Sequence, residues 1–271
     1  MTPKHAPGPT TTWWKVGRGI ESLVSVMGRW SWLPVALTPI MVLAAGTSRE
    51  ELTAKDIIER VAKVYAGAKW YRDSGVVEAR TRAAADDVSV DEELRFTTAF
   101  ARPDRFRFEF RIRINGQEFR HIIWRNGDEV QTWSNPRLDV ARPDTLNLAI
   151  AAATGISGGS AHTIPHLLLP DEVTEWRRTD MGDLERIEDA YVGRVECFRL
   201  SGRAEIPADG EFPAMTRTYM VWIEKRTFFL RRIDSTVESA TFRSDDSTTY
   251  DPVMDEEIPD RMLEFGAPKE N

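Results

Sequence analysis

Hydrophobic and polar positions alternate strictly between residues 105 and 114. Apolar side chains fill the even positions and charged side chains the odd ones: Phe106, Phe108, Phe110, Ile112 and Ile114 against Arg105, Arg107, Glu109, Arg111 and Arg113. Because successive side chains of a strand point to opposite faces of a sheet, this segment is predicted to be a strand with one apolar and one polar face. Asn115-Gly116 follows directly, and this dipeptide favours a tight turn, which indicates a hairpin.

Similar patterns predict antiparallel strands on both sides of a central helical region. Extended segments are expected at 70–82, 94–101, 105–114, 117–125, 128–134, 184–191, 194–204, 216–225, 228–238 and 240–249. Residues 52–68 and 144–154 have the character of helices, the first capped by Thr53. The polar stretches 83–93 and 205–215 are expected to be loops. The predicted fold class is therefore α+β, mainly β: a strongly curved antiparallel sheet, or half-open barrel, wrapped around helices.

Residues 1–46 have the organisation of a secretory signal peptide. A basic stretch precedes the apolar run 32–46, which ends in small residues, and this order is typical of a signal with its cleavage site. The run is shorter than the roughly 20 residues that span a bilayer. Cleavage after Ala45 or Gly46 would leave residues 47–271 as a single domain in the periplasm. The alternative is an uncleaved anchor in the inner membrane, since tryptophans, which favour membrane interfaces, lie within and before the run.

Composition excludes several classes of function. The formal net charge is −7, and the residues after 46 are more acidic than this total because the first 46 are basic. An acidic body has no electrostatic reason to bind nucleic acid. Cys197 is the only cysteine, which excludes an intramolecular disulfide and a thiolate metal cluster. No cofactor is indicated, and Cys197 is expected to pack in a strand as a small apolar residue.

Residues 155–159, Gly-Ile-Ser-Gly-Gly, match the Gly-x-Ser-x-Gly pattern of a hydrolase nucleophile elbow. That elbow requires a strand before the serine and a helix after it, whereas the residues before Ser157 are alanine-rich and helical. A glycine-rich helix end is the favoured interpretation, and a serine hydrolase built on Ser157 ranks last among the hypotheses. His162 and His166 have the spacing of two metal ligands, but Pro165 interrupts the helical face and no third ligand is near, so a surface loop is expected there.

Several short motifs occur in a recognisable order along the body. Phe100-Ala-Arg-Pro-Asp-Arg-Phe-Arg-Phe108 is an arginine-proline step that leads into an aromatic strand, and Arg125-Asn-Gly-Asp-Glu-Val-Gln-Thr-Trp133 is a glycine turn before a strand that ends in tryptophan. The early helix near Tyr65 precedes them, and the segments 220–232 and 258–265 follow. Together they resemble the periplasmic lipoprotein carriers typified by LolA, in the LolA/LolB-like superfamily that includes outer-membrane lipoprotein-sorting proteins.

The resemblance implies a bent, half-open sheet with helices across its mouth and an apolar cavity that takes acyl chains. Arg102 corresponds to the family arginine that hydrogen-bonds the helical lid and holds the empty cavity closed. Phe106 and Phe108 correspond to cavity-facing positions of the aromatic strand, and Phe110 lies on the same face. Trp133 corresponds to the aromatic residue after the glycine turn, so these four aromatic residues are the candidate ligand-binding residues.

The leading hypothesis is an exported, non-enzymatic carrier that holds lipid or lipoprotein acyl chains and acts in outer-membrane lipoprotein sorting. Burial of each CH₂ contributes about 0.8 kcal/mol, so a dry cavity would hold an acyl chain firmly. Helices within 144–169 would open to admit it, with Arg102 favouring the closed state. The alternative is an envelope sensor or scaffold that binds an envelope membrane protein through the same sheet. A sheet packed solidly on its own helices explains the aromatic face of 105–114 equally well.

Overall fold

The computed structural model describes residues 51–83, 89–135, 139–174, 184–208 and 213–267. They belong to one compact unit, Glu50–Asn271. The apolar run 32–46 and its predicted cleavage site lie outside the described residues. Within these ranges, no helix has both the length and the apolar character needed to cross a membrane.

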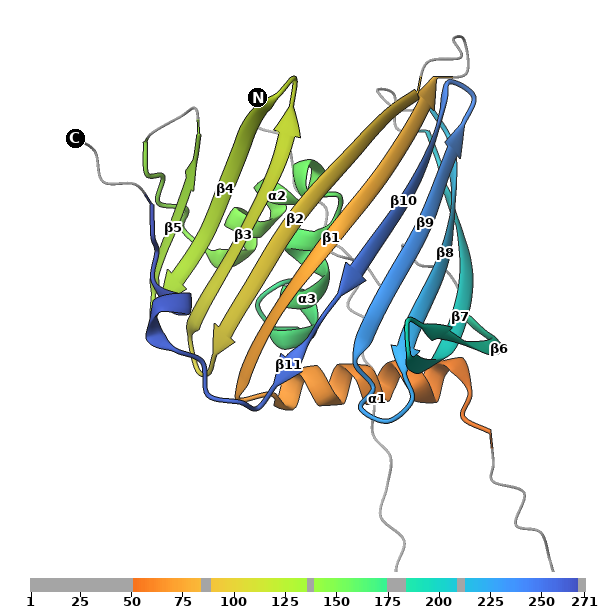
Figure 1. The fold of residues 1–271 in the computed structure, drawn as a ribbon, viewed down its shortest axis with the longest axis horizontal. Helices are drawn as coiled ribbons and strands as arrows, with labels where there is room; N and C mark the ends of the chain where they lie inside the picture. Colours follow the sequence, from red (N-terminus) through yellow and green to blue (C-terminus); the bar gives the residue numbers. More distant parts are fainter. Residues whose placement is uncertain (1–50, 84–88, 136–138, 175–183, 209–212, 268–271) are drawn as a thin grey trace, which may run out of the picture. The chain divides into compact units, whose positions relative to one another are not determined.

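An eleven-stranded antiparallel sheet forms this unit, with the hydrogen-bonded order β5-β4-β3-β2-β1-β10-β9-β8-β7-β6 and β11 paired beside this path with β1 (Figure 1). The edge strands β5 and β6 do not pair with each other, so the sheet stays open. This confirms the predicted fold class, α+β and mainly β. The strands are β1 (Trp70–Ala83), β2 (Ser89–Ala101), β3 (Arg105–Ile114), β4 (Gln117–Asn126), β5 (Glu129–Ser134), β6 (Glu185–Val192), β7 (Val195–Ile206), β8 (Met215–Glu224), β9 (Leu230–Ser239), β10 (Phe242–Tyr250) and β11 (Val253–Met254).

Within the described ranges, three α-helices accompany the sheet. The first, α1 (Ala54–Gly67), lies across one end of the strands, while α2 (Leu146–Thr154) and α3 (Ser160–Leu168) lie against one face (Figure 1). A short 3₁₀ turn, η1 (Gly155–Ser157), joins the last two. Helix α1 begins as predicted, because Thr53 and Asp56 form a reciprocal capping box.

The core lies between the helices and the face of the sheet that carries Phe106, Phe108 and Phe110, here called the inner face. These side chains belong to one buried cluster with residues of all three helices, including Tyr65 of α1, Ile150 of α2 and Leu168 of α3. Cross-strand register keeps the face uniform, since Phe100, Thr98 and Phe96 of β2 lie opposite the three phenylalanines. The predicted alternation of β3 therefore has a packing cause.

Two predicted loops are shorter than expected. Residues 89–93 belong to β2 rather than to a loop, because Arg80 and Asp91 pair directly across β1 and β2, with 2.6 Å between Nε and Oδ1. Opposite charges on neighbouring strands stabilise a ladder that has no apolar alternation. In the same way, β7 runs to Ile206 and β8 starts at Met215, so the predicted loop 205–215 loses both ends.

The segment after β11 covers part of the outer face, the side opposite the phenylalanines. A 3₁₀ turn, η3 (Asp260–Leu263), follows Ile258, and both Ile258 and Leu263 pack against Ala99 and Ala101 of β2. The indole Nε1 of Trp124 donates to the Leu263 carbonyl at 2.7 Å. The C-terminal segment thus docks on the sheet as a turn rather than as a strand.

Candidate functional site

An apolar cavity of about 190 Å³ lies on the inner face between α1, α3 and strands β8 and β9. Its walls include Val61 of α1, Leu167 of α3, Val221 of β8 and Ile233 of β9. The alternation of β8 and β9 places these branched side chains on the inner face, since Val221 and Ile233 are direct cross-strand partners. The cavity is therefore a gap between the helices and the sheet. On the sheet side its lining side chains are all aliphatic.

Arg102 connects the ends of α1 and α3, the two helices that line this cavity. It lies in the turn between β2 and β3, and its Nε donates to the Ala68 carbonyl at the end of α1 at 2.8 Å. Its Nη2 donates to the Ala66 carbonyl and, at 2.8 Å, to the Leu168 carbonyl at the end of α3. One guanidinium thus satisfies carbonyls that helix ends leave without partners. The contact with α3 is the one that the resemblance implies for a lid arginine, and its role in closure stays a prediction.

The three predicted cavity phenylalanines lie in packed core. Phe106, Phe108 and Phe110 have no exposed surface, and none of them lines the apolar cavity. The ring of Phe108 lies 5.9 Å from that of Phe96 and 6.1 Å from that of Phe110, between centroids. In this state of the protein they contact one another and the helices. Their rings fill the space between sheet and helices here, whereas the shorter side chains of β8 and β9 leave part of that space empty.

Trp133 points away from the phenylalanines. Phe108 pairs with Ile123, which pairs with Thr132, so the next residue of β5 faces the outer side. There the Trp133 ring lies under the guanidinium of Arg120, with 5.7 Å from Cζ to the ring centroid. The prediction that Trp133 lines the same cavity is therefore wrong, because a position carried over by motif does not fix the pairing register of a strand.

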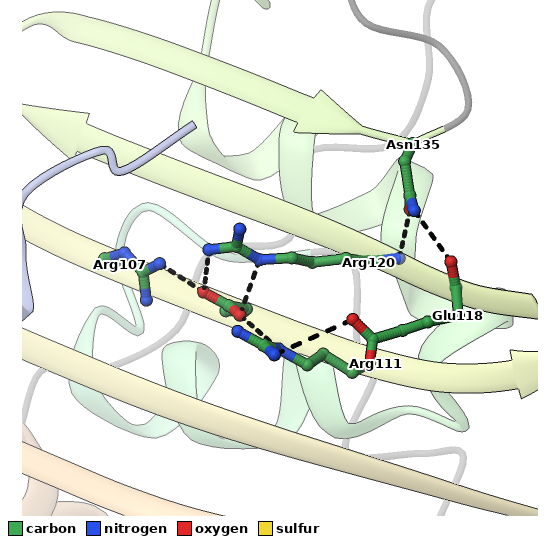
Figure 2. A network of polar contacts seen from close by, with 6 residues as sticks. Arg107, Arg111, Glu118, Arg120 and Asn135 are labelled. Carbon is green, nitrogen blue, oxygen red and sulfur yellow. Dashed lines mark hydrogen bonds and ion pairs between the residues drawn. The ribbon is translucent and has the colours of Figure 1, made fainter. Parts of the chain in front are cut away.

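A polar network occupies the outer face of β3 and β4 (Figure 2). Glu109 is buried and accepts hydrogen bonds from Arg111 Nε at 2.8 Å, from Arg120 Nε at 2.8 Å and from Arg107. Burial opposes the charge, but the hydrogen bonds from Arg120, Arg107 and Arg111 lower the pKa of Glu109 to about 2. The network gives the aromatic strand a second, ionic set of contacts. This network was not predicted from the sequence, although the charged residues at the odd-numbered positions of β3 indicated where it lies.

The Ser157 hydroxyl is used inside the helical region. It donates to the Thr154 carbonyl at 3.1 Å and accepts from the Ala161 amide at 3.1 Å, and Ser157 is fully buried. Helix α2, rather than a strand, comes before it. The strand-turn-helix geometry of a nucleophile elbow is therefore absent at this serine.

His162 and His166 lie on α3, so the predicted surface loop is wrong. Their rings are stacked with centroids 5.6 Å apart, and His162 is buried. Burial, with a smaller contribution from His166, lowers the pKa of His162 to about 4. The helix continues through Pro165, and His166 Nδ1 lies 2.6 Å from the Val173 carbonyl. Both imidazoles thus belong to the packing of α3.

Comparison with known proteins gave no match to a protein-family model and none to a curated protein. Similar solved structures include the lipoprotein LppX of Mycobacterium tuberculosis, with 16% identity, a TM-score of 0.37 and coverage of 75% of this chain and 95% of that one. LprF of Mycobacterium bovis has 9% identity and a TM-score of 0.42, with 79% and 97% covered. The LolA superfamily protein NE2245 of Nitrosomonas europaea has 11% identity and a TM-score of 0.31, with 79% and 98% covered. The likeness concerns the fold, so function has to be inferred from the residues of this chain.

Proposed function

We propose that the protein is an exported, non-enzymatic carrier that holds a lipid or lipoprotein acyl chain between its sheet and its helices. The observation that carries the proposal is the apolar cavity under β8 and β9, whose described lining side chains are aliphatic except for Thr163 and His166. Such a cavity favours hydrocarbon over water, and each CH₂ that enters it contributes about 0.8 kcal/mol. The signal-like organisation of residues 1–46 supports a site of action in the periplasm.

Binding of a whole acyl chain requires α3 to move. The cavity of about 190 Å³ is smaller than the roughly 300–1,000 Å³ of typical ligand sites. Ile164 and Leu168 of α3 belong to the same buried cluster as Phe106, Phe108 and Phe110. Displacement of α3 would therefore extend the cavity to the aromatic strand and bring these phenylalanines into contact with the ligand.

Arg102 would set the balance between the closed and open states. Displacement of α3 breaks the hydrogen bond from Arg102 to the Leu168 carbonyl, whereas the bonds to Ala66 and Ala68 of α1 can remain. Hydrogen bonds of a charged donor are stronger than neutral ones, so the closed state is favoured when no ligand is present. A ligand would open the site by the free energy gained on burial of its chain.

The test is native mass spectrometry of residues 47–271 purified from a bacterial periplasm, followed by lipid extraction. We expect a bound lipid that oleic acid displaces. Ala62→Trp should abolish binding, because this half-buried residue of α1 lines the cavity and an indole would fill it. Lys63→Trp, the exposed neighbour on the same helix, is the matched control and should bind as the wild type does.

A packed protein-binding module is the second candidate, and the fully buried state of Phe106, Phe108 and Phe110 favours it. A clean apo mass with no uptake of oleic acid would overturn the carrier proposal in its favour. In that case the described sheet would serve a protein partner, such as an envelope membrane protein, through its edges or its outer face.

A further inference from the structure

The inner face changes its chemistry along strands β8, β9 and β10. One transverse row of paired residues joins Val221, Ile233 and Thr248 and continues through Val77 of β1 to Leu94 of β2. Two residues further along each strand, and away from α1, the next row on the same face is polar. It contains Tyr219, Ser235, Asp246, Ala79 and Glu92.

A second cavity, of about 280 Å³, is lined by residues of both rows and is here called the head cavity. It adjoins the apolar cavity, because Thr163 and Ile233 line both. Arg217, Tyr219, Ser235 and Asp246 bring polar side chains to its lining. A long molecule can thus pass from aliphatic walls into a polar compartment without leaving the inner face.

Arg217 presents the cation of the head cavity. Its Nη1 donates to the Tyr219 hydroxyl at 3.2 Å, and its buried Nε has no hydrogen-bond partner within the described part of the chain. No ion pair within 4.0 Å joins Arg217 to a carboxylate of the described residues, whereas Arg186 of the same face pairs with Asp189 at 3.0 Å. A guanidinium in this state offers a forked donor to a phosphate or carboxylate.

Carboxylates line the head cavity and the next cavity along the inner face. Asp246 lines the head cavity and also a wider cavity of about 490 Å³, which Glu92 lines as well. Burial raises the pKa of Asp246, while the Ser244 hydroxyl, which donates to it at 3.1 Å, and the Arg217 guanidinium oppose this shift. Adjoining cavities therefore present, in order, hydrocarbon walls, then Arg217 with Asp246, and then Asp246 with Glu92.

We infer that the ligand is a zwitterionic phospholipid with an ammonium head group, an inference that rests on the proposed carrier function. Its acyl chain lies in the apolar cavity, its phosphate binds Arg217, and its ammonium lies between Asp246 and Glu92. The order of groups in such a lipid is the complement of the order along these cavities. An anionic head of similar size would meet the same carboxylates and be repelled, and a fatty acid would leave them without a partner.

The test is competitive loading of residues 47–271 from micelles that contain equal amounts of dioleoyl phosphatidylethanolamine, dioleoyl phosphatidylglycerol and oleic acid, with occupancies read by native mass spectrometry. We expect phosphatidylethanolamine to exceed phosphatidylglycerol by about tenfold, the scale of one charge-assisted hydrogen bond. Arg217→Ala should lower the occupancy of both phospholipids. Asp246→Asn combined with Glu92→Gln should remove the preference for the ammonium head.

Arg203→Ala is the matched control, since Arg203 is exposed and faces the outer side of β7, and it should leave the preference unchanged. Thermal unfolding of each variant shows whether it is folded, and Arg217→Lys, which keeps the charge without the fork, should retain part of the phospholipid occupancy. Equal loading of the two phospholipids by the wild type, or phospholipid occupancies that Arg217→Ala leaves unchanged, would overturn the head-group assignment and leave the carrier function intact. Failure of every lipid to bind would overturn both.

Discussion

The two halves of the sheet use the same inner face in opposite ways. In the half formed by β1 to β5, Phe106, Phe108 and Phe110 are fully buried in packed core, and the wider cavity lies against Ile112 and Ile114 at the other end of β3. In the half formed by β6 to β10, shorter side chains such as Val221 and Ile233 leave a cavity. Apolar positions mark the buried face in both halves, but they do not tell a packed face from a hollow one.

The outer face of the β1 to β5 half is also densely packed. Behind the aromatic strand, Glu109 is buried among three arginines and the C-terminal turn covers part of β2. Regions with dense contacts on both faces open least in native proteins, and regions with voids open more readily. We therefore regard the β1 to β5 half as the rigid wall of the site and the cavity half, with α3, as the part that adapts.

Truncation of Phe108 should have the largest effect. Phe108→Ala removes a fully buried ring and should lower the free energy of unfolding by about 3–5 kcal/mol, measured by urea denaturation. A matched pair makes the comparison direct: Ile123→Ala, in the packed half, should cost more than Ile233→Ala, which already borders a cavity. Equal losses for the two isoleucines would show that the halves are packed alike.

Neutralisation of Glu109 should have the next largest effect. Glu109→Gln leaves three arginines without their shared carboxylate and should cost about 2–3 kcal/mol at neutral pH. Because the folded pKa of about 2 lies below that of an unfolded glutamate, the stabilisation is present above about pH 4.5 and is lost as the pH falls towards 2. Urea denaturation across this range tests both statements. Glu118→Gln, at an exposed carboxylate of the same strand pair, should change little.

Much of the fold followed from periodicity, and the errors have identifiable causes. Alternation placed the strand cores correctly because a buried face needs apolar side chains at every second position. It missed residues 89–93 of β2, where the Arg80–Asp91 pair stabilises the ladder instead of apolar contacts. It also could not orient Trp133, because the faces of neighbouring strands depend on a pairing register that no single segment contains.

The cavity was harder to predict than the core. Residues 219–223, Tyr-Met-Val-Trp-Ile, are apolar on both faces of β8. Alternation of apolar and polar positions therefore cannot show which of their side chains lie on the inner face. Arg217 has an apolar partner, Val237, across the sheet, and only the register shows that it shares a face with Asp246. Arg102 was found through the resemblance, since an arginine before proline carries no signal of its contacts with α1 and α3.

Removal of the Arg102 side chain should loosen α3, which belongs to the adaptable part of the site. Arg102→Ala deletes the hydrogen bonds to the helix ends and should cost about 1–2 kcal/mol of stability. The more specific expectation is faster uptake of oleic acid, followed by native mass spectrometry over time, because α3 is held less firmly. Arg105→Ala removes a neighbouring arginine that pairs with Asp260 on the surface, and it should leave uptake unchanged. Slower uptake in Arg102→Ala would contradict a closing role.

Acid should loosen the same helix, with the smallest effect of the four. The buried imidazole of His162 has a pKa of about 4, below the 6.5 of an unfolded histidine, so the unfolded chain binds more protons between these values. Stability is therefore full above pH 6.5 and falls as the pH drops towards 4. His121, beside Phe110 in the packed half, also has a pKa of about 4 for the same reason.

The two histidines separate a local effect from a global one. His162→Phe and His121→Phe should each weaken the loss of stability between pH 7 and pH 5 in urea denaturation. Only His162→Phe should also slow the release of bound oleic acid at pH 5, since His162 lies on α3 and His121 lies on the rigid wall. Release that slows equally in both variants would mean that acid loosens the domain as a whole, and the division between a rigid and an adaptable half would fail.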